Sequence, residues 1–151
     1  MQNNKQTSGI YIHFPFCKVK CGYCDFNSHP ENREESAHYV DALLKELRSY
    51  AQKKYTVTSV FMGGGTPTIL LPSQLKQILN TVQQGFNLVP DCEITIEANP
   101  ATIKLQSLQE IRNAGYNRIS IGAQSFDQKE LQLLERVHSE KEIHSTVERA
   151  R

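Results

Sequence analysis

The chain has 151 residues, of which 38% are hydrophobic, so it is long enough for one domain with a sizeable core. Its formal net charge of +1 gives no electrostatic basis for binding nucleic acid or an anionic membrane, and we exclude both as partners. No apolar run approaches the ~20 residues that a membrane-spanning helix needs, so we expect no membrane span and a soluble, cytoplasmic protein.

The first third of the chain predicts one strand followed by one helix. Residues 1–9 are polar and are expected to form a loose lead-in. The apolar residues 10–14 predict a buried strand, and the polar stretch 30–35 predicts a turn. Apolar side chains then recur at helical spacing between Ala37 and Ala51, which predicts an amphipathic helix.

The middle of the chain repeats this order. Residues 57–62 predict a second buried strand, which ends in the triple glycine 63–65. Ser73 is a candidate N-cap for the next helix. Residues 87–91 predict a turn before a third strand at 93–97.

The last third of the chain again predicts helices alternating with a strand, and it contains helix-capping signals. The third helix is expected to end at Gly115, a candidate C-cap, and residues 118–122 predict a fourth strand. Asp127 is a candidate N-cap of a short helix. Ser139 and Glu142 form a capping box that begins the final helix.

Four alternations of strand and helix predict an α/β fold with four βα units and parallel strands. An eight-unit barrel typically needs ~250 residues, so four units would form an incomplete barrel. The fourth strand would then be an open sheet edge. We therefore interpret residues 1–151 as the N-terminal part of a larger core domain. Two origins stay open, a fragment of a longer chain or a truncated gene product.

Three cysteines lie on the loop that follows the first predicted strand. Cys17, Cys21 and Cys24 have the spacing C-x-x-x-C-x-x-C. Thiolates spaced this closely suit a single soft-metal centre, and an iron–sulfur cubane is the preferred candidate. Because a cubane has four irons, three cysteines would leave one iron open to another ligand.

Other uses of these cysteines are less consistent with the sequence. A structural zinc site would need a fourth ligand, which His13 or His29 could supply. A disulfide framework is disfavoured because the cysteines are few and no signal sequence is recognisable. Cys92 precedes the third strand, roughly 20 Å from the cysteine loop at the other end of the sheet. We interpret it as a packed core thiol.

Each of the four predicted strands is followed by a polar or glycine-rich feature. These are the cysteine loop, the triple glycine, Glu97 and Gln124. Because the carboxyl ends of parallel strands meet at one edge of a sheet, we expect the four features to lie together there. The triple glycine would allow a close approach of the backbone to a ligand or a positive φ. The dinucleotide pattern G-x-G-x-x-G is absent.

Five motifs along the chain resemble the radical S-adenosylmethionine (SAM) family. They are YIHFPFCKVKCGYCDF at 11–26, GGGTP at 63–67, IEANP at 96–100, RISIGAQSF at 118–126 and RVH at 136–138. Within the family they look like the branch of oxygen-independent coproporphyrinogen III oxidase and the heme chaperone HemW. The resemblance implies a partial (βα) radical-SAM barrel, of which this chain supplies four N-terminal units.

The same resemblance implies a set of cofactor ligands. Cys17, Cys21 and Cys24 would hold a [4Fe–4S] cluster, with SAM on the open iron. The residues that would bind SAM are Tyr11, Tyr23, Gly64, Gly65, Thr66, Glu97, Gln124 and Arg136. Among these, Arg136 suits a carboxylate because its guanidinium can bind one bidentately. No catalytic side chain is assigned.

The function implied is that of a HemW-like protein in heme delivery or porphyrin metabolism. Heme and heme-acceptor proteins are further candidate partners, although the family's presumed heme-binding region lies beyond residue 151. The coproporphyrinogen dehydrogenases carry another cysteine where this chain has Phe26, and a longer N-terminal extension. Both differences favour a heme chaperone over an oxygen-independent coproporphyrinogen III dehydrogenase. A truncated, non-catalytic metal-binding fragment is the second alternative.

Overall fold

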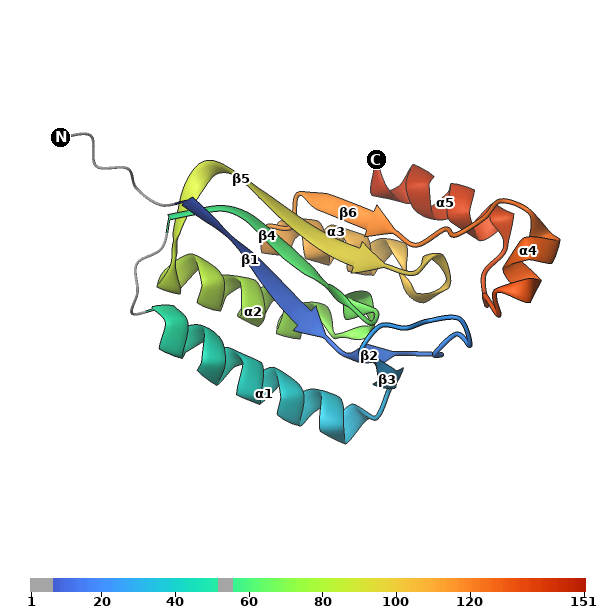
Figure 1. Cartoon of the computed structure of the whole chain (residues 1–151). Coiled ribbons are helices and arrows are strands. Elements are labelled where there is room, and N and C mark those ends of the chain that lie inside the picture. The colour runs from blue at the N-terminus through green and yellow to red at the C-terminus, as the bar shows by residue number, and fades with distance from the viewer. Residues whose placement is uncertain (1–6, 52–55) are drawn as a thin grey trace.

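The computed structural model describes residues 7–51 and 56–151, which form a parallel sheet with helices packed against it (Figure 1). The four strands are β1 (Thr7–Phe14), β4 (Thr56–Gly64), β5 (Asn87–Ala98) and β6 (Arg118–Ile121). They lie in the order β1-β4-β5-β6, and every neighbouring pair is parallel. The predicted α/β class and the four parallel strands are therefore confirmed.

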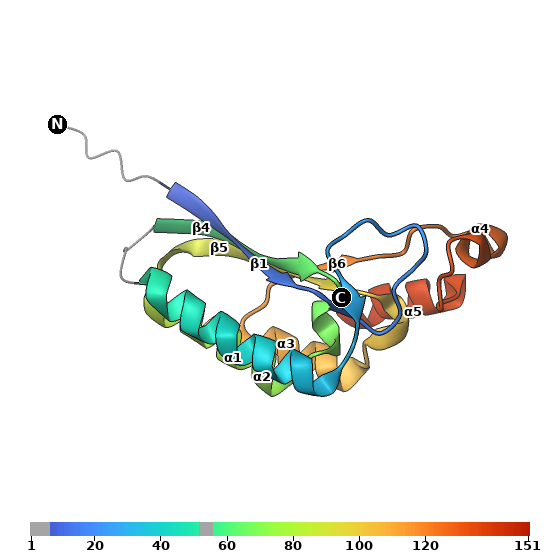
Figure 2. The same cartoon turned by 60° about the horizontal axis from the view of Figure 1, so that its bottom comes forward.

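Three helices cover one face of the sheet. They are α1 (Arg33–Tyr50), α2 (Pro72–Gly85) and α3 (Leu105–Ala114), and Figure 2 shows them side by side beneath the strands. The shorter α4 (Gln128–Leu133) and α5 (Glu140–Ala150) follow β6. Single 3-10 turns occur at η2 (Pro67–Ile69) and η3 (Pro100–Thr102).

The core lies between the sheet and these helices because strand side chains alternate between the two faces. The strands contribute Ile12, Phe14, Val60, Met62, Ile94 and Ile96, and the helices contribute Val40, Leu44, Leu75, Ile78, Leu79 and Ile111. The intervening strand residues, such as Tyr11, His13 and Phe61, are not fully buried. The second face of the sheet is thus the more polar one, and the carboxyl ends of its strands border the cysteine loop.

Two predicted boundaries near the N-terminus are wrong. β1 begins at Thr7, so residues 7–9 belong to the strand, while residues 1–6 of the expected lead-in lie outside the described residues. α1 begins at Arg33, inside the predicted turn, because the Asn32 side chain accepts hydrogen bonds from the backbone N–H groups of Glu34 and Glu35.

Two predictions in the middle of the chain are also wrong. Ser73 does not cap α2, which instead begins at Pro72, and the Gln74 side chain accepts a hydrogen bond from the Leu71 N–H at 3.0 Å. The expected turn at 87–91 lies within β5. Leu88 pairs with Val57 and Glu93 pairs with Ser59, so four residues of β5 bulge opposite one of β4.

The capping signals in the last third are confirmed. Gly115 ends α3 in the left-handed conformation, with φ of 114°. The Asp127 carboxylate accepts hydrogen bonds from two N–H groups at the start of α4. Ser139 and Glu142 form the expected capping box of α5. The Ser139 N–H and hydroxyl both donate hydrogen bonds to the Glu142 carboxylate, and these bonds lower the pKa of Glu142.

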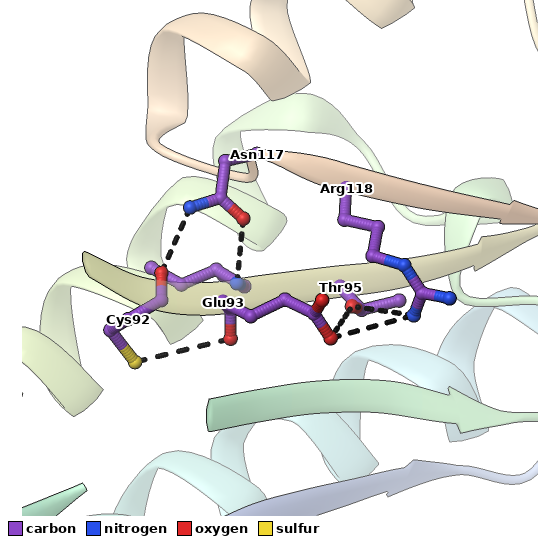
Figure 3. A network of polar contacts seen from close by, with 6 residues as sticks. Cys92, Glu93, Thr95, Asn117 and Arg118 are labelled. Carbon is purple, nitrogen blue, oxygen red and sulfur yellow. Dashed lines mark hydrogen bonds and ion pairs between the residues drawn. The ribbon is translucent and has the colours of Figure 1, made fainter. Parts of the chain in front are cut away.

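The prediction that Cys92 precedes the third strand is wrong, because β5 begins at Asn87 and Cys92 lies within it. Cys92 takes part in a polar network that ties β5 to β6 (Figure 3). The Asn117 amide donates to the Cys92 carbonyl at 2.9 Å and accepts from the Ile94 N–H at 2.7 Å. The Arg118 guanidinium donates to the Glu93 carboxylate at 3.5 Å. The thiol of Cys92 is buried, which raises its pKa, so the prediction of a packed core thiol is confirmed.

No helix in residues 7–51 or 56–151 is long and apolar enough to cross a bilayer.

Candidate functional site

The cysteine loop is closed at its base by a short parallel ladder that sequence reasoning missed. β2 (Phe16–Cys17) pairs with β3 (His29–Pro30). The His29 N–H donates to the Pro15 carbonyl at 2.7 Å, and the Glu31 N–H donates to the Cys17 carbonyl at 2.8 Å. Two-residue ladders have no hydrophobic periodicity, so no sequence pattern indicates this one.

Within the loop, two contacts fold the chain back on itself. The Lys20 ammonium donates to the Ser28 carbonyl at 2.8 Å, and Ser28 is almost fully buried. The Cys24 N–H donates to the Cys21 carbonyl at 3.0 Å, so these two cysteines lie on one tight turn. All three cysteines of the loop are free thiols, and Cys21 is buried.

The triple glycine packs against the backbone that leads into the cysteine loop. The Gly65 N–H donates to the Phe14 carbonyl at 2.7 Å, and the Thr66 N–H donates to the Phe16 carbonyl at 2.8 Å. A Cβ on Gly65 would lie 2.4 Å from the Phe16 oxygen. Gly64 has φ of 113°, which also favours glycine. Contact between two backbone segments thus accounts for Gly65, and the positive φ accounts for Gly64.

Glu97 fastens the end of β5 to the same glycine turn. Its carboxylate accepts a hydrogen bond from the Gly64 N–H at 3.0 Å, and the side chain is half-buried. A Cβ on Gly63 would lie 2.6 Å from this carboxylate. The position agrees with the expectation that Glu97 lies at the carboxyl edge of the sheet.

These elements surround a cavity of about 290 Å³ at the carboxyl ends of the strands. It is lined by all three cysteines and by seven of the eight residues expected to bind SAM, namely Tyr23, Gly64, Gly65, Thr66, Glu97, Gln124 and Arg136. Tyr11 is the exception. It is 59% exposed, and its hydroxyl contacts His13 Nδ1 at 3.1 Å in a separate hollow beside α1.

Arg136 has a partly unsatisfied guanidinium at this cavity. Its Nη2 donates to the Gly122 carbonyl at 3.0 Å, and its Nη1 lies 3.6 Å from the Cys21 sulfur. Its Nε is buried without a hydrogen-bond partner. Buried donors are normally paired, so this group fits an acceptor supplied by a bound anionic ligand.

His138 has a structural role that the sequence did not indicate. It is 1% exposed, and its Nε2 donates to the Ala123 carbonyl at 2.9 Å while Nδ1 contacts the Asn99 side chain at 3.2 Å. It therefore joins the segment after β5 to the segment after β6. Burial lowers its pKa, although the contact with the Ala123 carbonyl opposes that effect.

The donor set does not resemble a preformed site for one metal ion. In the part of the chain that the structure describes, no three His, Cys, Asp or Glu side chains are grouped to hold one. Both ring nitrogens of His13 have other partners, Tyr11 and the Asn27 carbonyl. His13 is half-buried. It is therefore not directed at the thiols as the fourth ligand of a zinc site.

Comparison with known proteins agrees with this geometry. The sequence model of the Radical SAM superfamily matches residues 11–151. The chain belongs to the radical SAM superfamily. This radical SAM chain is 43% identical over 137 residues to the heme chaperone HemW of Escherichia coli K12, and 41% identical over 139 residues to that of Mycobacterium tuberculosis H37Rv. These alignments cover 88% and 89% of the chain and 36% of each relative.

A solved radical SAM structure shares the fold. Coproporphyrinogen III oxidase (HemN) from Escherichia coli superposes with a TM-score of 0.88 and 32% identity, over 97% of this chain and 34% of the other. The partial radical SAM barrel expected from the sequence is therefore confirmed. The chain spans little more than a third of the length of these relatives.

Proposed function

We propose that this chain binds a [4Fe–4S] cluster and SAM as the N-terminal part of a HemW-like protein of heme delivery or porphyrin metabolism. The observation that carries the proposal is the cavity lined by three free cysteines together with Arg136, whose buried Nε lacks a partner. The superfamily membership supports the same cofactor pair.

Cys17, Cys21 and Cys24 would hold three irons of the cluster, and SAM would complete the fourth. When bound, this pair supplies one-electron reduction of the sulfonium of SAM. The guanidinium of Arg136, which lines the cavity, would bind the SAM carboxylate. Tyr23, which is half exposed on the cysteine loop, would cover the cluster or stack on adenine.

The remaining SAM contacts divide into two groups. The Gly64–Thr66 turn and Glu97 lie on one side of the cavity, where the backbone of Gly65 would face the amino group of SAM. Gln124 and Arg136 follow β6 on the other side. Tyr11, whose hydroxyl contacts His13, is a further proposed SAM contact.

A heme-chaperone role is favoured over dehydrogenation by two observations. The HemW relatives are up to 43% identical to this chain, whereas the HemN structure is 32% identical. Phe26 is 64% exposed at the cavity, at the position where the resemblance expects a cysteine in the dehydrogenases. We place the protein in a reducing compartment such as the cytoplasm because free thiols are required.

Anaerobic reconstitution with iron and sulfide tests the cluster. We expect about four irons and four sulfides per chain, and Cys21→Ala should lose them because two thiolates hold a cubane poorly. Cys92→Ala is the matched control, since that thiol is buried away from the cavity and should leave iron content unchanged. A folded chain that takes up no iron would contradict the proposal, and a chain that binds zinc alone would favour the metal-binding fragment.

SAM binding is tested on the reconstituted chain by calorimetry and by the electron paramagnetic resonance spectrum of the reduced cluster. SAM should change that spectrum, and Arg136→Lys should weaken binding without lowering iron content, because lysine lacks the planar fork. Assays of the full-length protein separate the two heme-related functions. Product formation from coproporphyrinogen III would support the dehydrogenase, whereas heme transfer to an acceptor would support the chaperone.

A further inference from the structure

Glu135 contacts the cysteine loop from a backbone position that glycine usually occupies. It follows α4 and has φ of 52°, in the left-handed region where glycine is usual at the end of a helix. The Glu135 N–H donates to the Gln132 carbonyl and the Arg136 N–H to the Leu131 carbonyl, so this helix end is fully formed. A residue with a Cβ is strained in this conformation relative to glycine.

The carboxylate of Glu135 reaches the loop between two cysteines. It accepts a hydrogen bond from the Gly22 N–H at 2.7 Å, across 113 positions of sequence. A Cβ on Gly22 would lie 3.0 Å from the same carboxylate oxygen, so a glycine there permits the close approach. Gly22 lies immediately after Cys21 and two residues before Cys24.

The same turn touches the loop at a second point. The Cys21 thiol lies 3.9 Å from the Glu135 carbonyl oxygen, and Arg136 Nη1 lies 3.6 Å from the Cys21 sulfur. Residues 135 and 136 therefore hold Cys21 and Gly22 in place through backbone and side-chain contacts. The 2.7 Å hydrogen bond from the Gly22 N–H to the Glu135 carboxylate is charged and short, and such bonds are among the stronger ones.

We propose that Glu135 is a positioning residue that latches the cysteine loop and lowers the reduction potential of the cluster the loop would hold. The second part rests on the proposed function. Cluster potentials depend on net charge and on hydrogen bonds to the sulfurs. Glu135 acts on both, because it adds a negative charge beside the loop and occupies the Gly22 N–H, which then cannot donate to a cluster or cysteine sulfur.

Two variants separate the latch from the charge. Glu135→Gly removes the carboxylate and suits the positive φ, so the chain should fold with unchanged or greater stability. Glu135→Gln keeps an oxygen acceptor for the Gly22 N–H but removes the charge. Glu148→Gln is the matched control, because Glu148 is an exposed carboxylate on α5 that does not line the cavity.

Hydrogen exchange of the Gly22 amide in the cluster-free protein tests the latch without any cofactor. Exchange should become about tenfold faster in Glu135→Gly, change less in Glu135→Gln and stay unchanged in Glu148→Gln. Equal exchange in the original chain and Glu135→Gly would overturn the latch, whether or not the chain binds a cluster.

Redox titration of the reconstituted chain tests the charge. The midpoint potential should become less negative in Glu135→Gln and in Glu135→Gly, with iron content equal to that of the Glu148→Gln control. An unshifted potential in both variants would overturn this part of the inference. A chain that takes up no iron refutes the proposed function instead, and the exchange experiment still decides the latch.

Discussion

Gly65→Ala offers the sharpest test of how the site is assembled. The new Cβ would lie 2.4 Å from the Phe16 oxygen, 2.7 Å from its carbonyl carbon and 2.9 Å from its nitrogen. All three are backbone atoms, so no side-chain rotation relieves the overlap. Either the glycine turn or the strand leading into the cysteine loop must move.

The expected cost follows from two contributions. Overpacking of a rigid site typically costs ~1–3 kcal/mol. The movement would also weaken the hydrogen bonds from the Gly65 N–H to the Phe14 carbonyl and from the Thr66 N–H to the Phe16 carbonyl, each worth about 1 kcal/mol. Because these contributions overlap, we expect a loss of about 3 kcal/mol in the free energy of unfolding.

Urea unfolding measures this loss, and iron content after reconstitution measures its effect on the site. Gly9→Ala is the control, because its Cβ would meet the Ser59 hydroxyl, a side-chain atom, at 3.0 Å. That variant should change stability by less than ~1 kcal/mol and leave iron uptake intact. If Gly65→Ala has the same free energy of unfolding and the same iron content as the original chain, the backbone contact does not require glycine at this position and the reasoning is refuted.

Three further predictions concern the framework around the site. Asn117→Ala should cost about 2 kcal/mol in urea unfolding because it removes two hydrogen bonds to the backbone of β5, whereas Arg118→Ala should cost under ~1 kcal/mol because its ion pair is exposed. Tyr116→Phe should lower the free energy of unfolding by about 1 kcal/mol, since it removes the buried hydroxyl that donates to the Leu75 carbonyl. Burial lowers the pKa of His138 from its ordinary value of 6.5, so the unfolded chain binds the proton first as pH falls. Stability should therefore decline below about pH 6.5, and His138→Gln should flatten that decline; an unchanged pH profile would contradict it.

Local signals were sufficient to predict the succession of strands and helices along the chain and the capped helix ends in its last third. Gly115, Asp127 and the Ser139–Glu142 pair each act within one helical turn, so their roles can be inferred from neighbouring residues. The convergence of the motifs was predictable for a similar reason. Once the strands are taken as parallel, the segments that follow them must meet at one edge.

The errors arose where tertiary contacts override local preference. Pro90 and Asp91 are typical turn residues, yet they lie in a bulge of β5 because the strand continues its pairing with β4 beyond them. Tyr11 matches a motif, but the motif does not indicate that its hydroxyl contacts His13, two residues along β1. Nothing in the sequence indicates that Glu135 adopts a positive φ or reaches Gly22.

The cysteine loop is held by three separate parts of the chain, and each contact is made by protein atoms alone. The β2–β3 ladder closes its base, the Gly64–Thr66 turn supports the strand that enters it, and residues 135 and 136 hold its middle. Arg136 takes part in this support and also lines the cavity. Its Nε is one of two buried side-chain polar atoms without a hydrogen-bond partner among the described residues, the other being Thr68 Oγ1. The side chain that contacts the Cys21 sulfur is therefore also one with a donor left for another acceptor.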